Sequence, residues 1–175
     1  MMAPRVVLIG PPGAGKTTVG QLLAEQLRVS FRDTDEDVER TTGRRIADIF
    51  TTDGEAVFRK LEEEAVAVAL QEHQGVLALG GGAVLSERTR RVLADHFVVF
   101  LSVGLAEGAK RVGLSTARPL LAGVNPRATY RTLLEQRLPV YREAASVEVA
   151  TDHLTAQEVV DRITAELPPT VPAGS

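Results

Sequence analysis

The sequence predicts an α/β protein built around a parallel β-sheet, because short β-rich runs alternate with longer segments of helical periodicity. The first run, Val6 to Ile9, is continuously apolar, as expected for a central strand that is covered on both faces. The chain has 175 residues and shows no internal repeat and no linker. We therefore expect a single domain over residues 1–167.

Further runs along the chain are candidates for strands and helices of this domain. Strands are predicted at 29–32, 76–79, 97–101 and 147–149, and amphipathic helices at 16–28 and 55–70. Asn125 and Pro126 are typical of an N-cap followed by proline at the first helical position. Thr155 and Glu158 have the spacing of a capping box. A helix is therefore expected to begin at each of these two points.

Two segments depart from the alternation of strands and helices. Residues 113–124 contain two glycines, a proline and two hydroxyl residues, which predicts a mobile surface loop and a candidate lid. Residues 168–175 are Pro-rich, and we expect a disordered tail there.

Composition limits the function. A net charge of −3 and a pI near 5.7 argue against a protein that binds nucleic acid or an anionic membrane. The absence of cysteine excludes disulfides, thiol catalysis and cysteine-based metal sites. The three histidines are isolated and are interpreted as surface or strand-end residues.

The apolar run near the start is too short for a signal peptide core or a membrane span, so we expect a cytoplasmic protein. We also expect the protein to be a monomer.

The strongest motif runs from Gly10 to Thr17 and matches G-x-x-x-x-G-K-[ST] in full. Its glycines allow successive backbone N–H groups to face one phosphate, at the positive end of the helix that follows. Lys16 would reach the β- and γ-phosphates, and the Thr17 hydroxyl would coordinate Mg²⁺. A phosphate-binding loop alone does not separate kinases from GTPases or ATP-driven machines. However, no Asn-Lys-x-Asp guanine signature occurs, and the chain has little room for a coupling domain.

An acidic pair follows the second predicted strand. If Asp33 and Asp35 extend that strand, its period of two points both carboxylates to the same side. One would then lie near Mg²⁺ and the other near a substrate hydroxyl. The alternative is a solvated acidic turn or an N-cap that begins the next helix.

Arginines and a glycine run supply the other candidates. Arg59 can clamp a carboxylate bidentately, although an exposed helical pair with Glu63 is the simpler interpretation. Gly80 to Gly82 follow a strand at the edge where open α/β sheets bind ligands, unless they form a plain turn. Arg118 on the loop could stabilise a transferring phosphoryl group, and Arg137 is a weaker signal.

Taken together, these motifs resemble the shikimate kinase family in order and spacing. The resemblance extends from Val6 to about Val149. Besides the phosphate-binding loop, it covers these segments: 33–35, Gly43 with 46–50, Gly54-Glu55 with Phe58-Arg59, Glu62, 80–82, 118–120, and Arg137 with Pro139 and Tyr141. It implies a three-layer fold of the P-loop kinase type, with a five-stranded parallel sheet flanked by helices.

The resemblance also implies a reaction and a set of roles. ATP would phosphorylate the 3-hydroxyl of shikimate, a step of aromatic amino-acid synthesis, with a substrate-binding region at about 33–62 and a lid at about 113–124. The residues implied for catalysis are Lys16, Asp35 and Arg118. Those implied for ATP are Gly13, Ala14, Gly15, Lys16, Thr17, Thr18, Arg111 and Arg118. Those implied for shikimate are Asp35, Arg59, Gly81, Gly82 and Arg137, and those for Mg²⁺ are Thr17 and Asp33.

Two alternatives remain at this stage. One is a P-loop kinase for another small metabolite, such as gluconate or a nucleoside monophosphate, which would not need all these motifs together. The other is a nucleotide-binding regulatory module without turnover, against which the several catalytically suited residues argue.

Overall fold

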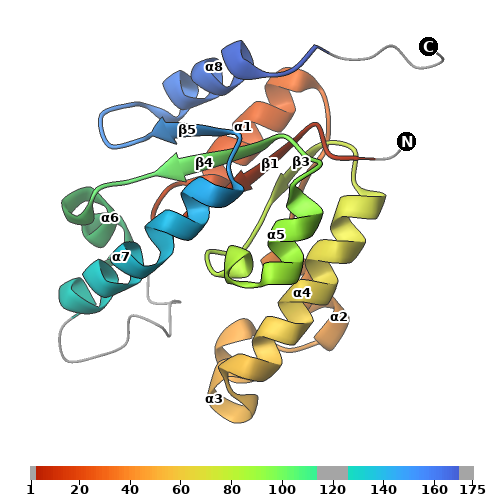
Figure 1. Cartoon of the computed structure of the whole chain (residues 1–175), viewed down its shortest axis with the longest axis vertical. Helices are drawn as coiled ribbons and strands as arrows, with labels where there is room; N and C mark the ends of the chain where they lie inside the picture. The colour runs from red at the N-terminus through yellow and green to blue at the C-terminus, as the bar shows by residue number, and fades with distance from the viewer. Residues whose placement is uncertain (1–2, 114–125, 170–175) are drawn as a thin grey trace.

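The computed structural model describes residues 3–113 and 126–169, and its centre is a five-stranded parallel sheet (Figure 1). The spatial order of the strands is β2-β3-β1-β4-β5, and every neighbouring pair is parallel. The strands are β1 (Val6–Ile9), β2 (Phe31–Asp33), β3 (Val76–Ala78), β4 (Val98–Ser102) and β5 (Val147–Ala150). The predicted three-layer α/β fold with a five-stranded sheet is therefore confirmed.

Helices connect the strands and cover both faces of the sheet. They are α1 (Lys16–Leu27), α2 (Thr34–Thr42), α3 (Ile46–Asp53), α4 (Glu55–Glu72), α5 (Glu87–Leu93), α6 (Leu105–Gly113), α7 (Pro126–Ala144) and α8 (Ala156–Glu166), with a short 3₁₀ turn at Ala83–Leu85. The predicted capping box at the start of α8 is present, because Thr155 and Glu158 bond to each other's backbone N–H. The helix predicted from Pro126 is present too, whereas Asn125 lies outside the described residues.

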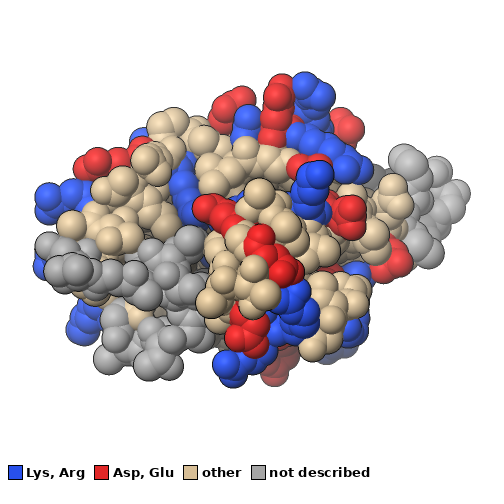
Figure 2. Space-filling model, turned by 90° about the horizontal axis from the view of Figure 1, so that it is seen from below, with Lys and Arg blue, Asp and Glu red and all other residues tan. Residues whose placement is uncertain are grey.

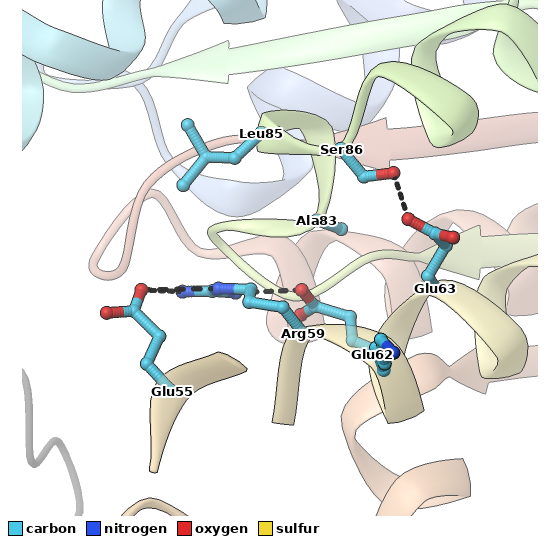
Figure 3. A pocket seen from close by; sticks show the side chains of 8 residues that line it. Glu55, Arg59, Glu62, Glu63, Ala83, Leu85 and Ser86 are labelled. Carbon is cyan, nitrogen blue, oxygen red and sulfur yellow. Dashed lines mark hydrogen bonds and ion pairs between the residues drawn. The ribbon is translucent and has the colours of Figure 1, made fainter. Parts of the chain in front are cut away.

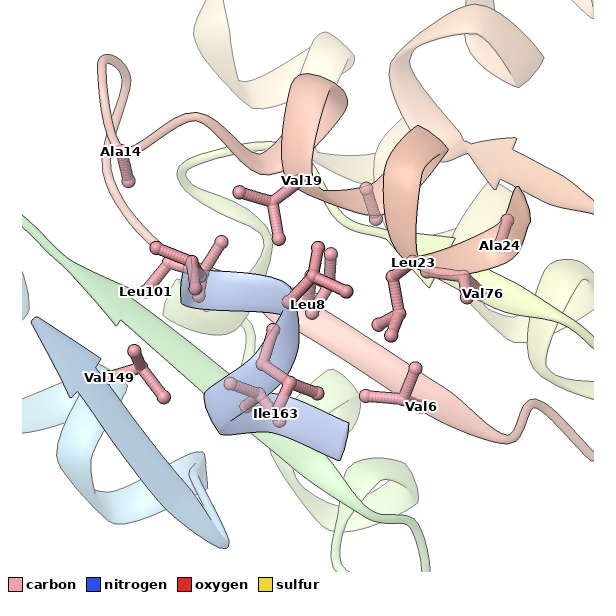
Figure 4. Packing of buried hydrophobic residues seen from close by; sticks show 14 of the residues in the cluster. Val6, Leu8, Ala14, Val19, Leu23, Ala24, Val76, Leu101, Val149 and Ile163 are labelled. Carbon is pink, nitrogen blue, oxygen red and sulfur yellow. The ribbon is translucent and has the colours of Figure 1, made fainter. Parts of the chain in front are cut away.

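The core is divided by the sheet into two layers. Val6 and Leu8 of β1 pack with residues of α1 and α8 on one face (Figure 4). Val7 and Ile9, which point the other way, pack against α4, α5 and α7. Both faces of β1 are fully covered, which explains why its sequence is apolar without alternation.

One local expectation needs correction. The second strand covers 31–33 rather than 29–32, because the C-terminal cap of α1 extends to Val29, whose N–H bonds to the Ala24 carbonyl beside a left-handed Arg28. His73 is the strand-end residue that was one of the two interpretations, and it is only 8% exposed. Its Nε2 lies 3.1 Å from the Ser30 carbonyl and 3.0 Å from the Val76 carbonyl, so it joins the beginnings of β2 and β3.

The strand order brings three chain segments to one edge of the sheet. The phosphate-binding loop follows β1, Asp33 ends β2, and the glycine run follows β3, which lies between β1 and β2. Because the strands are parallel, their carboxyl ends share this edge, where α/β proteins of this type bind ligands.

The surface carries both signs of charge. Figure 2 shows Lys and Arg side chains interspersed with Asp and Glu on one face of the molecule. Among the helices that the structure describes, none is long and apolar enough to cross a membrane.

Candidate active site

The loop from Gly10 to Gly15 forms the nucleotide end of the site. Gly13 and Gly15 both have φ of +88°, a left-handed conformation that side chains other than glycine rarely adopt, and Gly15 caps α1. Lys16 folds back over the loop, where its Nζ donates to the carbonyls of Gly10 at 2.6 Å and Pro11 at 3.1 Å. The lysine ammonium is therefore held at the mouth of the loop, where a phosphate would bind.

The outer side of the loop is supported by α6 and α7. Arg111 donates from Nη1 to the Gly13 carbonyl at 3.0 Å and also bonds to Thr151 and Glu107. Tyr130 donates its hydroxyl to the Pro12 carbonyl at 2.6 Å. Arg111 thus joins the phosphate-binding loop to the turn after β5, and a role beside the adenine remains a prediction.

The acidic pair has a different local structure from the one expected. Asp33 ends β2 and is the N-cap of α2, and its Oδ1 accepts from the Asp35 N–H at 2.8 Å. Asp35 therefore lies in the first helical turn, and the period of two does not apply to it. The N-cap alternative is correct, yet Asp35 still faces the site, because its Oδ1 lies 2.5 Å from the position of a Cβ added to Gly80.

Asp33 lies near the phosphate-binding loop. Burial raises the pKa of its carboxyl, while the hydrogen bond from the Asp35 N–H and the nearby Lys16 ammonium oppose that rise. Together with the Thr17 hydroxyl, the Asp33 carboxylate offers oxygen donors of the kind that Mg²⁺ prefers. The described residues contain no group of three or more His, Cys, Asp or Glu that could hold a metal alone. This donor set fits an ion that shares its ligands with bound phosphates.

Arg59 on α4 is held between two carboxylates (Figure 3). Its Nη1 lies 2.7 Å from Oε1 of Glu62, and its Nη2 lies 3.3 Å from Oε1 of Glu55. The alternative of an exposed pair with Glu63 is wrong, because Glu63 instead accepts from the Ser86 hydroxyl and pairs with Arg88. The Glu62 side chain is therefore buried, at 3% exposed, whereas that of Glu63 is 29% exposed.

Aromatic rings and the glycine run enclose the Arg59 guanidinium. Its central carbon lies 5.3 Å from the ring centroid of Phe58 and 5.9 Å from that of Phe50, within the range of cation–π attraction. A Cβ added to Gly82 would lie 2.5 Å from Nη2 of Arg59, so only glycine permits this approach. Beside Arg59 is a cavity of about 250 Å³, lined also by Glu55, Glu62 and Ser86 among others.

Arg137 approaches the glycine run from α7. It is only 6% exposed, and its Nη1 lies 3.5 Å from the position of a Cβ added to Gly81. Its charge also acts on Glu62, whose pKa is raised by burial, while Arg59 and Arg137 oppose that rise. Tyr141, one turn further along α7, donates its hydroxyl to the Gly81 carbonyl at 2.5 Å.

The structure thus gathers most of the predicted site residues around the glycine run and the phosphate-binding loop. The acceptor candidates that meet at the glycine run are Asp35, Arg59, Gly81, Gly82 and Arg137. Arg118 and nearly all of the predicted lid lie outside the described residues.

Two residues of this cluster had no assigned role in the sequence prediction, Glu62 and Tyr141. A signal for Glu62 was present, because it lies four residues after Phe58 and four before Val66, on the buried stripe of α4. Tyr141 gave no local signal, since its partner is 60 residues away in the sequence.

Comparison with known proteins shows extensive similarity. The family model described as shikimate kinase matches residues 12–168. A shikimate kinase from Saccharopolyspora erythraea is 69% identical over 162 residues, which cover 93% of each chain. One from Thermobifida fusca is 56% identical over 94% of this chain and 95% of its own. The solved structure of shikimate kinase from Acinetobacter baumannii in complex with shikimate has a TM-score of 0.89 and 37% identity, with 94% of this chain and 92% of the other covered.

Proposed function

The chain belongs to the shikimate kinase family, and we propose that it transfers the γ-phosphoryl group of ATP to the 3-hydroxyl of shikimate. The observation that carries the proposal is the meeting of Arg59, Arg137 and Asp35 around one glycine run, beside the phosphate-binding loop. Two cations can bind a carboxylate, and a carboxylate can bind ring hydroxyls. A related enzyme solved with shikimate supports this choice of acceptor.

Binding of the acceptor is divided between its two ends. Arg59 and Arg137 bind the shikimate carboxylate, and the backbone of Gly81 and Gly82 contacts the ring. Asp35 binds the ring hydroxyls, and its carboxylate orients the attacking hydroxyl and takes up its proton. The carboxylate of Asp35 lies against Gly80, at the same edge as the phosphate-binding loop, which supports an attack toward the γ-phosphate.

Binding of ATP relies on the loop between β1 and α1. The N–H groups of this loop and the first turn of α1, from Gly13 to Thr18, bind the phosphates, and Lys16 stabilises charge on the transferring group. Arg111 borders the adenine, and Arg118, which lies outside the described residues, is proposed to bind the phosphates. Thr17 and Asp33 would hold Mg²⁺, which would neutralise phosphate charge when bound. Phosphoryl transfer needs mainly positioning and charge stabilisation, and this set of side chains supplies both.

We further propose that a single domain over residues 1–167 acts as a cytoplasmic monomer on these small molecules, without a nucleic-acid or membrane partner. The net charge of −3 and the mixed charges on the face in Figure 2 support the absence of a nucleic-acid or anionic-membrane partner.

The test is release of ADP from MgATP with different acceptors: shikimate, quinate, gluconate, CMP or none. The proposal requires turnover with shikimate well above that with every other acceptor. Quinate is the sharpest control, because it also carries a ring carboxylate. Turnover with gluconate or CMP in place of shikimate would refute the acceptor site. ATP binding without turnover on any acceptor would favour the regulatory module.

A further inference from the structure

The only two tyrosines of the chain both lie on α7, and both are buried. Each is only 1% exposed, and each donates its hydroxyl to a backbone carbonyl in a ligand-binding loop. Tyr130 bonds to Pro12 in the phosphate-binding loop, at 2.6 Å, and Tyr141 bonds to Gly81 in the glycine run, at 2.5 Å. One helix is thus attached to both halves of the site by the same chemical group.

The ring of Tyr141 is fixed independently of this bond. It stacks on Phe100 of β4, with the ring centroids 4.9 Å apart and the planes at 25°. The hydroxyl therefore projects from an anchored ring, and its position is set by the sheet. An anchored donor can hold a flexible glycine segment in one conformation at little further loss of entropy.

Arg137 is the second group at this point. It lies four residues before Tyr141 on the same helix face, and both side chains reach Gly81: the Tyr141 hydroxyl bonds to its carbonyl, and Arg137 Nη1 lies 3.5 Å from the position of a Cβ added there. Burial raises the pKa of Tyr141 to about 12, although Arg137 opposes that rise, so the hydroxyl stays protonated in any ordinary assay. The hydroxyl can therefore donate to Gly81 and accept from Arg137 at the same time.

The glycine run is held from its other side as well. The Gly80 N–H donates to Oγ1 of Thr34 at 3.2 Å, and Thr34 is completely buried. Thr34 and Tyr141 thus bind consecutive glycines from opposite elements, α2 and α7. Because the Tyr141 hydroxyl bonds to Gly81, which Arg137 also approaches from the same face of α7, that hydroxyl is placed to set their relative position.

We propose that Tyr141 is a positioning residue for the acceptor: its hydroxyl fixes Arg137 and the Gly81 backbone in the arrangement that receives the substrate carboxylate. This inference rests on the proposed function, and it adds a residue that itself does not touch the substrate. Tyr130 has the matching position toward the nucleotide, which makes it a natural control.

The test compares Tyr141→Phe with Tyr130→Phe, since each variant removes one buried hydroxyl from the same helix and keeps the ring. For Tyr141→Phe we expect the KM for shikimate to rise about tenfold, with kcat and the KM for MgATP changed less than about twofold. For Tyr130→Phe we expect the KM for MgATP to rise and that for shikimate to stay within about twofold. Thermal unfolding of both variants measures the structural cost that they share.

A double-mutant cycle with Arg137→Lys tests whether the hydroxyl acts through Arg137. Tyr141→Phe should then raise the KM for shikimate far less in the Arg137→Lys background than in the wild type. An unchanged KM for shikimate in Tyr141→Phe, or equal effects of the two tyrosine variants on both substrates, would overturn the positioning role while leaving the kinase activity established. A wild type without turnover of shikimate would overturn the proposed function and this inference together.

Discussion

Arg59 Nη1 lies 2.7 Å from Oε1 of Glu62, a carboxylate that is only 2% exposed. The buried carboxylate of Glu62 thus orients the guanidinium, and the rings of Phe50 and Phe58 border it. The same guanidinium lies against Gly82 of the glycine run. Arg59 is therefore arranged before the substrate arrives, which reduces the entropy lost on binding.

Arg59→Lys should raise the KM for shikimate at least about tenfold, with a smaller effect on kcat. A lysine keeps the charge but loses the planar fork that binds a carboxylate bidentately. Steady-state kinetics with each substrate varied in turn measures the effect. Arg91→Lys is the control, because Arg91 pairs with Glu87 on the exposed face of α5, away from the site. If Arg59→Lys left the KM for shikimate unchanged, the clamp would be wrong.

Glu55→Gln should lower the KM for shikimate about twofold. Glu55 lies 3.3 Å from Arg59 Nη2 with its side chain 54% exposed, so it competes with an incoming carboxylate but binds weakly. The effect should shrink at high ionic strength, which screens exposed pairs. Glu87→Gln, which removes an equivalent exposed pair on α5, should change nothing. A higher KM in Glu55→Gln would mean that Glu55 helps to position Arg59.

Gly82→Ala should reduce affinity for shikimate severalfold at little cost in stability. The added Cβ would displace the Arg59 guanidinium, which is the mobile end of a side chain. Gly75→Ala provides the contrast, because its Cβ would collide with the backbone carbonyl of Ser30, which cannot move alone. We expect a lowered Tm in Gly75→Ala and a raised dissociation constant in Gly82→Ala. Calorimetry and thermal unfolding of both variants measure the two effects, and the reverse assignment would contradict this view of the glycine run.

Glu62 and Glu63 should contribute to stability with opposite dependence on pH. Burial raises the pKa of Glu62, so its contribution is full below its ordinary pKa of 4.5 and is lost as pH rises through the higher folded value. The Ser86 hydroxyl and Arg88 lower the pKa of Glu63, so its contribution is present above 4.5 and is lost as pH falls. The free energy of unfolding of each Glu→Gln variant, compared with the wild type across a pH series, should show these two slopes. Equal slopes would contradict the assignment of Glu62 to a buried site.

Long periodic segments of the sequence predicted the fold well. The continuous apolar run of β1 and the stripes of α1 and α4 indicated the central strand and two of its covering helices. The second strand was misplaced because Val29 and Ser30 look like strand residues, while the backbone at Val29 still belongs to the end of α1. The end of α1 is set by Arg28, which adopts a left-handed backbone conformation. The residue type does not predict that conformation.

The site was predicted residue by residue but not contact by contact. Asp35, Arg59 and Arg137, which the resemblance implied for shikimate, all lie around the glycine run, and their roles stay predictions. The alternative for Arg59 named Glu63 as its partner, whereas Glu62, on the buried stripe of α4 with Phe58 and Val66, forms the short pair. Tyr141 was part of the resemblance but received no role, since its role depends on a bond between α7 and the segment after β3, which only the tertiary fold brings together.

The strand order also bears on how the specificity of such a protein can diverge. Most residues proposed for the acceptor lie on the segments around β2, α4 and β3, while the proposed phosphate site is the loop after β1. After gene duplication, substitutions in the segments around β2, α4 and β3 could change which small acid is bound. The phosphate-binding loop would remain unchanged. Helix α7 is the exception, because Tyr130 and Tyr141 attach it to both halves. We therefore expect the sequences of duplicated copies to vary least in α7.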